Sequence, residues 1–62
     1  MNGYYRLVVE QLRAHGYSFL RAGKGSHEIW TNGQRNQVVP FNCHSRLTAN
    51  GILKQAGIAH RF

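Results

Sequence analysis

Apolar residues recur at helical spacing near both ends of the chain, and a glycine follows each run. Residues 3–15 carry apolar side chains at spacings of three, four and seven, which predicts an amphipathic helix that Gly16 ends in a left-handed conformation. Thr48 is a favourable N-cap for a second helix, which Gly57 closes. The apolar faces of the two helices consist of Tyr4, Tyr5, Val8, Val9 and Leu12, and of Ala49, Ile52, Leu53 and Ala56.

The first half of the region between these helices has the pattern of a β-hairpin. In residues 17–22 the β-formers Tyr17 and Phe19 alternate with Ser18, which predicts a strand, although Leu20 breaks the polar face. The segment Gly23-Lys24-Gly25 is predicted to be a tight turn, because two glycines supply the backbone freedom that a reversal needs. Residues 26–31 are then the second strand.

A second hairpin follows directly. The pair Asn32-Gly33 tolerates the positive φ angles of a type I′ turn, so residues 34–39 are expected to return antiparallel to the second strand. Pro40 cannot donate a ladder hydrogen bond and therefore ends the third strand or lies at an edge. Residues 41–47 are predicted to be a loop.

The predicted order is α-β-β-β-α, an α+β fold in which residues 1–62 form one domain. Its apolar surface is buried most simply when both helices pack on one face of a three-stranded antiparallel sheet, which leaves the opposite face open. Alternation along the second strand separates His27, Ile29 and Thr31 from Ser26, Glu28 and Trp30. Trp30 has a large apolar side chain, so its burial under the helices is expected to stabilise the fold most. His27 is therefore expected on the open face.

The charge balance indicates a polyanionic partner. The chain has eight Lys and Arg residues but only two acidic residues, Glu10 and Glu28, so its formal net charge is +6 and its isoelectric point is near 10.5. A field of this sign attracts nucleic acid of any sequence, and it also attracts an acidic protein. The basic residues are spread along the chain, so a folded surface must gather them.

Other function classes are disfavoured. A single cysteine, Cys43, excludes an intramolecular disulfide, and Cys43-His44 does not supply the roughly four ligands of a structural zinc site. The segment Gly23-Lys24-Gly25-Ser26 lacks the spacing of a nucleotide-binding P-loop. We find no apolar run of membrane-spanning length and no signal-peptide pattern. We therefore expect a cytoplasmic protein without metal, small-molecule cofactor or membrane contact.

Several short motifs follow one another over nearly the whole chain: His15-Gly16-Tyr17, Lys24-Gly25-Ser26-His27, Val38-Val39-Pro40, Thr48-Ala49-Asn50 and the run from Ile52 to Ile58. In this order they resemble the HicA toxins, which are small ribonucleases of bacterial toxin–antitoxin pairs. The resemblance implies a fold similar to a double-stranded-RNA-binding domain. It also implies cleavage of messenger RNA, which inhibits translation, and a HicB-type antitoxin as partner. The family's catalytic histidine falls on His27.

The residues around His27 suit RNA cleavage without a metal. Histidine titrates near neutral pH, so a neutral imidazole is available to take the proton of a 2′-hydroxyl. Arg21 and Lys24 are close along the chain and are expected to hold the scissile phosphate, which the amides of Gly25 and Ser26 can approach. Further phosphate contacts are expected from Arg46 and Lys54. The general acid is open between His44, a lysine and water.

Two departures and two rival functions accompany this hypothesis. Many HicA toxins carry a second histidine where this chain has Glu28, and the loop at residues 41–47 is shorter than in many relatives, so the resemblance carries no role over to Glu28 or His44. Glu28 is expected to face inward and to pair with an arginine.

The main alternative function is a non-catalytic RNA-binding module that binds a duplex by its shape. The other is a small interaction protein whose basic face binds an acidic partner.

Overall fold

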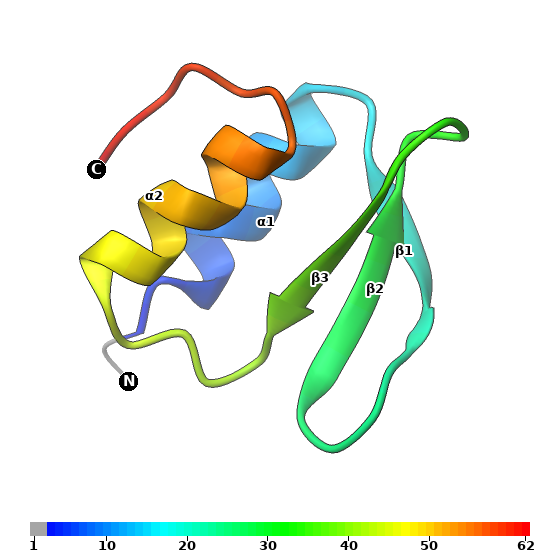
Figure 1. Ribbon diagram of the computed structural model, residues 1–62, viewed down its shortest axis with the longest axis horizontal. Helices are drawn as coiled ribbons and strands as arrows, with labels where there is room; N and C mark the ends of the chain where they lie inside the picture. Colours follow the sequence, from blue (N-terminus) through cyan, green and yellow to red (C-terminus); the bar gives the residue numbers. More distant parts are fainter. Residues whose placement is uncertain (1–2) are drawn as a thin grey trace.

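The computed structural model of the protein describes residues 3–62. Its elements, in chain order, are α1 (Tyr5–Ala14), β1 (Ser18–Ala22), β2 (His27–Thr31), β3 (Asn36–Pro40) and α2 (Arg46–Gln55). The three strands form one antiparallel sheet in the order β1-β2-β3, and both helices lie on the same side of it (Figure 1). The predicted α-β-β-β-α order and α+β class are confirmed.

Both helices end as the two glycines predict. Gly16 and Gly57 have φ angles of 88° and 80°, in the left-handed region that side chains disfavour. The backbone N–H of Tyr17 then donates to the Leu12 carbonyl at 2.9 Å, and that of Ile58 donates to the Leu53 carbonyl at 2.8 Å. These bonds satisfy carbonyls that would otherwise be orphaned at a helix end.

The start of α2 differs from the prediction. The N-cap is Ser45, whose hydroxyl accepts the backbone N–H of Thr48 at 3.3 Å, and the helix begins at Arg46. The prediction of Thr48 as N-cap was wrong because Ser45 and Thr48 are both good caps, and the apolar spacing does not tell them apart. As a result, Arg46 and Leu47 lie in the first turn of the helix and not in the preceding loop.

The connection between β2 and β3 also differs. Thr31 pairs with Asn36, so the loop holds the four residues between them and is not a two-residue type I′ turn. Among residues 3–62 only glycines have a positive φ, Gly33 at 93°, whereas a type I′ turn would need one at Asn32 as well. The Asn32 side chain instead accepts the N–H groups of Gln34 and Arg35 at 2.9 and 2.7 Å. This local bond competes with the tighter turn.

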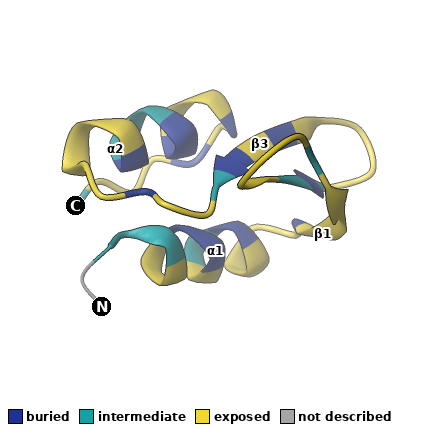
Figure 2. Cartoon of the chain, turned by 90° about the horizontal axis from the view of Figure 1, so that it is seen from below, coloured by how far each residue is buried: buried dark blue, intermediate teal, exposed yellow. Residues whose placement is uncertain are grey.

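The core lies between the two helices and the inner face of the sheet. Figure 2 shows the buried positions of α1, α2 and β3 turned toward this space. Trp30 is only 2% exposed, as its predicted place under the helices requires. The Tyr17 hydroxyl donates to the Ala56 carbonyl at 2.9 Å and so ties the end of α1 to the end of α2. The predicted apolar faces are confirmed at Val8, Val9, Leu12, Ala49, Ile52, Leu53 and Ala56, which are buried, while Tyr4 and Tyr5 are half-buried.

Gly51 lies in the middle of α2, and replacing it should stabilise the protein. A Cβ at this position would meet nothing within 4 Å, and its φ is that of an ordinary helix. Since glycine costs about 1 kcal/mol relative to alanine inside a helix, we expect Gly51→Ala to stabilise the fold by roughly that amount. For a domain of this size this corresponds to a melting temperature about 4–8 °C higher. Thermal unfolding followed by circular dichroism measures it, and an unchanged or lower melting temperature would contradict the expectation.

Candidate functional site

His27 is the first residue of β2 and is exposed on the open face of the sheet. Its ring Nδ1 lies 3.0 Å from the carbonyl oxygen of Lys24, which also accepts the backbone N–H of His27 at 3.2 Å. A carbonyl oxygen can only accept, so Nδ1 carries the proton of the neutral ring. The lone pair of the neutral imidazole is therefore on Nε2. This nitrogen is the atom able to take a proton from a bound substrate.

The turn between β1 and β2 is closed around His27 by glycine. The N–H of Gly23 donates to the His27 carbonyl at 2.8 Å, and a Cβ on Gly23 would come within 3.2 Å of that oxygen. Gly25 has a φ of 65°, which side chains disfavour. Within residues 3–62, no hydrogen bond uses the N–H of Gly25 or Ser26, and both residues are exposed. Two amide donors thus remain available for an anion beside His27.

We expect Gly25→Ala to destabilise the protein for a conformational reason alone. An added Cβ would meet nothing within 4 Å, but a left-handed conformation costs an L-residue about 1–2 kcal/mol. Urea unfolding should show a loss of that size, whereas Gly25→Asn should lose less because asparagine tolerates this region better. Equal stability of native and Gly25→Ala proteins would mean that the turn adopts another conformation in solution.

A β-bulge brings Arg21 to the same face as His27. In the pairing of β1 with β2, Phe19 lies opposite Trp30 and Arg21 lies opposite Ile29, so Leu20 is the extra residue. Without the bulge, simple alternation would place Arg21 on the helix side with Phe19. With it, Arg21 is a diagonal neighbour of His27, at a spacing of roughly 7–8 Å that a long side chain can bridge. Arg21 and the two free amides therefore flank His27 in the fold, and the Lys24 carbonyl accepts from its ring.

Apolar side chains flank this group on the open face. Leu20 and Val38 are both about half exposed, at 49% and 48%. Val38 lies opposite Ile29, and Leu20 directly precedes Arg21, the residue opposite Ile29 on the other neighbouring strand. A sheet face that combines a histidine and an arginine with uncovered aliphatic side chains is suited to a macromolecular partner.

Glu28 faces inward, as predicted, but its hydrogen bonds are not to an arginine. Its Oε1 accepts the hydroxyl of Tyr5 at 2.6 Å and the indole N–H of Trp30 at 3.0 Å. Tyr5 belongs to α1, so this carboxylate joins the first helix to the strand that begins with His27. Glu28, next to the candidate base His27, thus has a structural role, because its carboxylate accepts hydrogen bonds from Tyr5 and Trp30. Sequence alone did not reveal this, because Tyr5 and Glu28 are far apart in the chain.

Burial and the bond to Glu28 raise the pKa of Tyr5. Burial, the hydrogen bond to Glu28 and the negative charge of its carboxylate raise the pKa of Tyr5 from 10.0 to about 12. Because the folded-state pKa is raised, the stabilising contribution of the neutral phenol is present below pH 10 and is lost as the pH rises toward 12. Absorbance at 295 nm should show one of the three tyrosines ionising last. Tyr5→Phe should remove that phase, while Tyr4→Phe should leave it in place.

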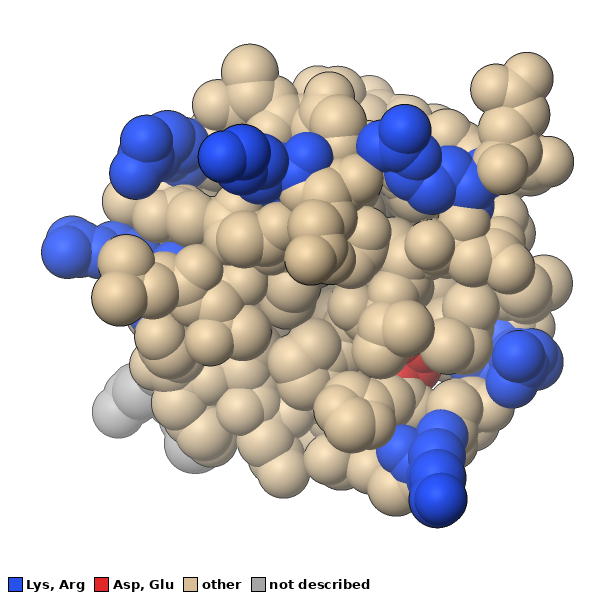
Figure 3. Space-filling model, in the orientation of Figure 1, with Lys and Arg blue, Asp and Glu red and all other residues tan. Residues whose placement is uncertain are grey.

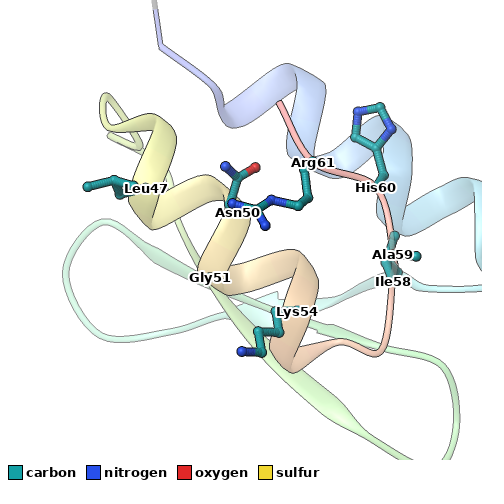
Figure 4. A pocket seen from close by; sticks show the side chains of 8 residues that line it. All are labelled: Leu47, Asn50, Gly51, Lys54, Ile58, Ala59, His60 and Arg61. Carbon is teal, nitrogen blue, oxygen red and sulfur yellow. The ribbon is translucent and has the colours of Figure 1, made fainter.

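The remaining predicted residues lie elsewhere. Arg46 is the first residue of α2, and Lys54 lines a hollow of about 330 Å³ between α2 and the C-terminal segment, together with Arg61 and His60 (Figure 4). This hollow lies on the helix side of the sheet. Lys54 therefore does not belong to the group around His27, although it remains a basic surface residue.

His44 lines a groove of about 880 Å³ beside α1, on the helix side of the sheet. Sequence reasoning missed this groove as a whole. Its other cations, Arg6 and Arg13, contribute to the net charge without a motif of their own, and the sequence pattern places Phe41 in the predicted loop. The sequence feature that could have indicated this groove is the spacing of Arg6 and Arg13, which lie two turns apart on one helix face.

On the face that Figure 3 shows, the basic side chains are not gathered into one patch, although the sequence led us to expect it. Figure 3 shows them around the rim of this face, along its upper edge and at its lower right, with little acidic surface between them.

In the part of the chain that the structure describes, no cluster of three or more metal-ligating side chains is found. Within the same residues, no helix is long and apolar enough to cross a membrane. Cys43 is buried, and its burial raises the pKa of the thiol.

Comparison with known proteins identifies one family. The family model described as the HicA toxin of bacterial toxin–antitoxin pairs matches residues 5–58, from the first residue of α1 to just beyond the end of α2. No curated protein and no solved structure gives a significant match.

Proposed function

The chain belongs to the HicA toxin family, the toxins of bacterial toxin–antitoxin pairs, and from this premise we propose that it is an endoribonuclease that cleaves messenger RNA with His27 as general base. Residues 1–62 form the toxin domain, which acts in the cytoplasm and inhibits translation. The observation that carries the proposal is the bond from His27 Nδ1 to the Lys24 carbonyl, which leaves Nε2 free on the open face.

The reaction follows from this geometry. Nε2 takes the proton of a 2′-hydroxyl, and the 2′-oxygen attacks the adjacent phosphorus as the bond to the 5′-oxygen breaks. The leaving 5′-oxygen takes a proton from water. The products are a 2′,3′-cyclic phosphate and a 5′-hydroxyl. Negative charge grows on the phosphorane oxygens, where Lys24, Arg21 and the free N–H groups of Gly25 and Ser26 supply compensating donors. Arg46 and Lys54 contact more distant phosphates. No step needs a metal ion.

The partner is a HicB-type antitoxin. The open face offers the two features that an inhibitory protein needs: aliphatic side chains at Leu20 and Val38, and the positive charge of Arg21. An acidic antitoxin that covers this face excludes RNA from His27. The positive field that draws RNA then also speeds the approach of the antitoxin.

The proposal is tested by incubating the purified protein with messenger RNA in the presence of EDTA. Cleavage is expected, and treatment of the fragments with a phosphatase that opens and removes cyclic phosphates should change their electrophoretic mobility. Products with 5′-phosphate ends would contradict the mechanism. RNA that is bound but stays intact would favour the non-catalytic RNA-binding module instead.

A further inference from the structure

The groove beside α1 takes no part in the reaction at His27, yet its lining has the composition of a nucleic-acid site. Its walls are one side of α1 and the loop after β3, and its volume is about 880 Å³. The side chains that matter are Tyr5, Arg6, Glu10, Arg13, Phe41 and His44.

The charge of the groove favours an anion. Arg6 and Arg13 lie on the same side of α1, His44 stands on the opposite wall, and Glu10 is the single carboxylate in the lining. The only other acidic residue of the chain, Glu28, is engaged by Tyr5 and Trp30. A second copy of this chain, with a net charge of +6, is therefore a poor occupant, and a polyanion is a good one.

An exposed aromatic ring distinguishes the groove from a simple basic surface. Phe41 is 56% exposed although it is a large apolar residue, and its ring lies 4.8 Å from that of Tyr5 with an interplanar angle of 56°. Tyr5 is in turn held by Glu28 at 2.6 Å. Phe41 is thus backed by a fixed ring and presents its free side to solvent. Such a surface suits the flat face of a base, on which single-stranded nucleic acids stack.

The groove is also joined to the candidate active site. The N–H of Phe41 donates to the carbonyl of Ser26 at 2.7 Å, and Pro40 pairs with His27 across the two strands. A strand whose scissile phosphate lies at His27 passes Phe41 after crossing the edge of the sheet.

We propose that this groove binds the unpaired RNA strand next to the cleavage site, with Phe41 stacking on one base and Arg6, Arg13 and His44 contacting phosphates. This inference rests on the proposed ribonuclease function and adds the substrate class. The substrate is single-stranded, because a base that stacks on Phe41 must be out of a duplex.

The test measures binding separately from cleavage. Fluorescence polarisation with 2′-O-methyl RNA, which has no free 2′-hydroxyl, compares a single strand with a hairpin duplex of the same composition. We expect Phe41→Ala to weaken binding of the single strand by about 5- to 100-fold and that of the duplex by less than two-fold. Phe41→Trp should retain the affinity. Leu47→Ala is the matched control, since Leu47 is an exposed apolar residue at 77% and lies outside this groove.

Three results would overturn the inference. Single-strand affinity within two-fold of native for Phe41→Ala would show that the ring does not stack on RNA, and equal losses for strand and duplex would show that the groove does not select unpaired bases. Unchanged RNA affinity with lost binding of a polyglutamate peptide would make the groove a protein site. Circular dichroism of each variant controls for folding. Cleavage of RNA in EDTA by the native protein is scored independently, so failure at the groove and failure of the ribonuclease proposal are distinguishable.

Discussion

Replacing His27 by alanine is expected to lower the rate of RNA cleavage by about 10²- to 10⁴-fold, the usual contribution of a general base. The loss should appear in kcat, because the proton transfer is made in the transition state and the imidazole is not needed to hold the phosphates. Affinity for a non-cleavable RNA should change little. The fold should survive, since His27 is exposed and the hydrogen bond of its side chain is to the turn.

His15 provides a matched control. It is also exposed, and its Nδ1 lies 2.9 Å from a backbone carbonyl, that of Gln11. It therefore presents an imidazole held in the same way, but at the end of α1 and away from the β1–β2 turn. His15→Ala should cleave RNA at the native rate. Equal cleavage by native and His27→Ala proteins in EDTA would remove His27 from the mechanism, and equal losses in both variants would point to a general effect of histidine on folding or RNA binding.

Replacing Trp30 by alanine is expected to remove most of the stability of the protein. Removal of a large buried aromatic ring costs about 3–5 kcal/mol. A domain of 62 residues has a total stability of only about 3–9 kcal/mol. Trp30 also supports Glu28 through its indole N–H, lies under the Arg13 guanidinium at 5.1 Å and meets the edge of Phe19 at 6.0 Å. The Trp30→Ala protein should be largely unfolded at 37 °C.

Urea unfolding by circular dichroism, with two comparison variants, separates the contributions. Trp30→Phe keeps an aromatic ring and loses the bond to Glu28, so it should lie between native and Trp30→Ala. Phe19→Ala removes a ring that is 51% exposed and should cost much less. A Trp30→Ala protein that unfolds at the native urea concentration would show that the tryptophan is not the anchor of the sheet.

The main elements were predictable because each has a local cause. Gly16 and Gly57 end helices through their own backbone freedom, and the spacing from Ala49 to Ala56 marks a buried face whatever it packs against. The errors occurred where two local options are nearly equal in energy. Ser45 and Thr48 compete as N-caps of α2. The Asn32 side chain accepts the backbone N–H groups of Gln34 and Arg35, and this arrangement competes with a type I′ turn.

The candidate site was predictable only in part. His27 on the open face and the glycine turn follow from alternation and composition. The position of Arg21 does not, because the bulge at Leu20 results from the pairing of two strands. Nor do the partners of Glu28, since Tyr5 approaches it only when α1 packs on the sheet. The sequence also contains nothing that assigns the proton to Nδ1 of His27, which depends on the Lys24 carbonyl.

The inward position of Glu28 has a consequence for every solution measurement on this protein. With that carboxylate bonded inside, eight basic residues are opposed at the surface by Glu10 alone. The RNA binding proposed here would displace condensed cations from the phosphates, so we expect the logarithm of the affinity to fall linearly with the logarithm of the salt concentration. A modest rise in ionic strength is then expected to release RNA without any change in the fold. An affinity for this toxin is therefore meaningful only together with the salt concentration at which it was measured.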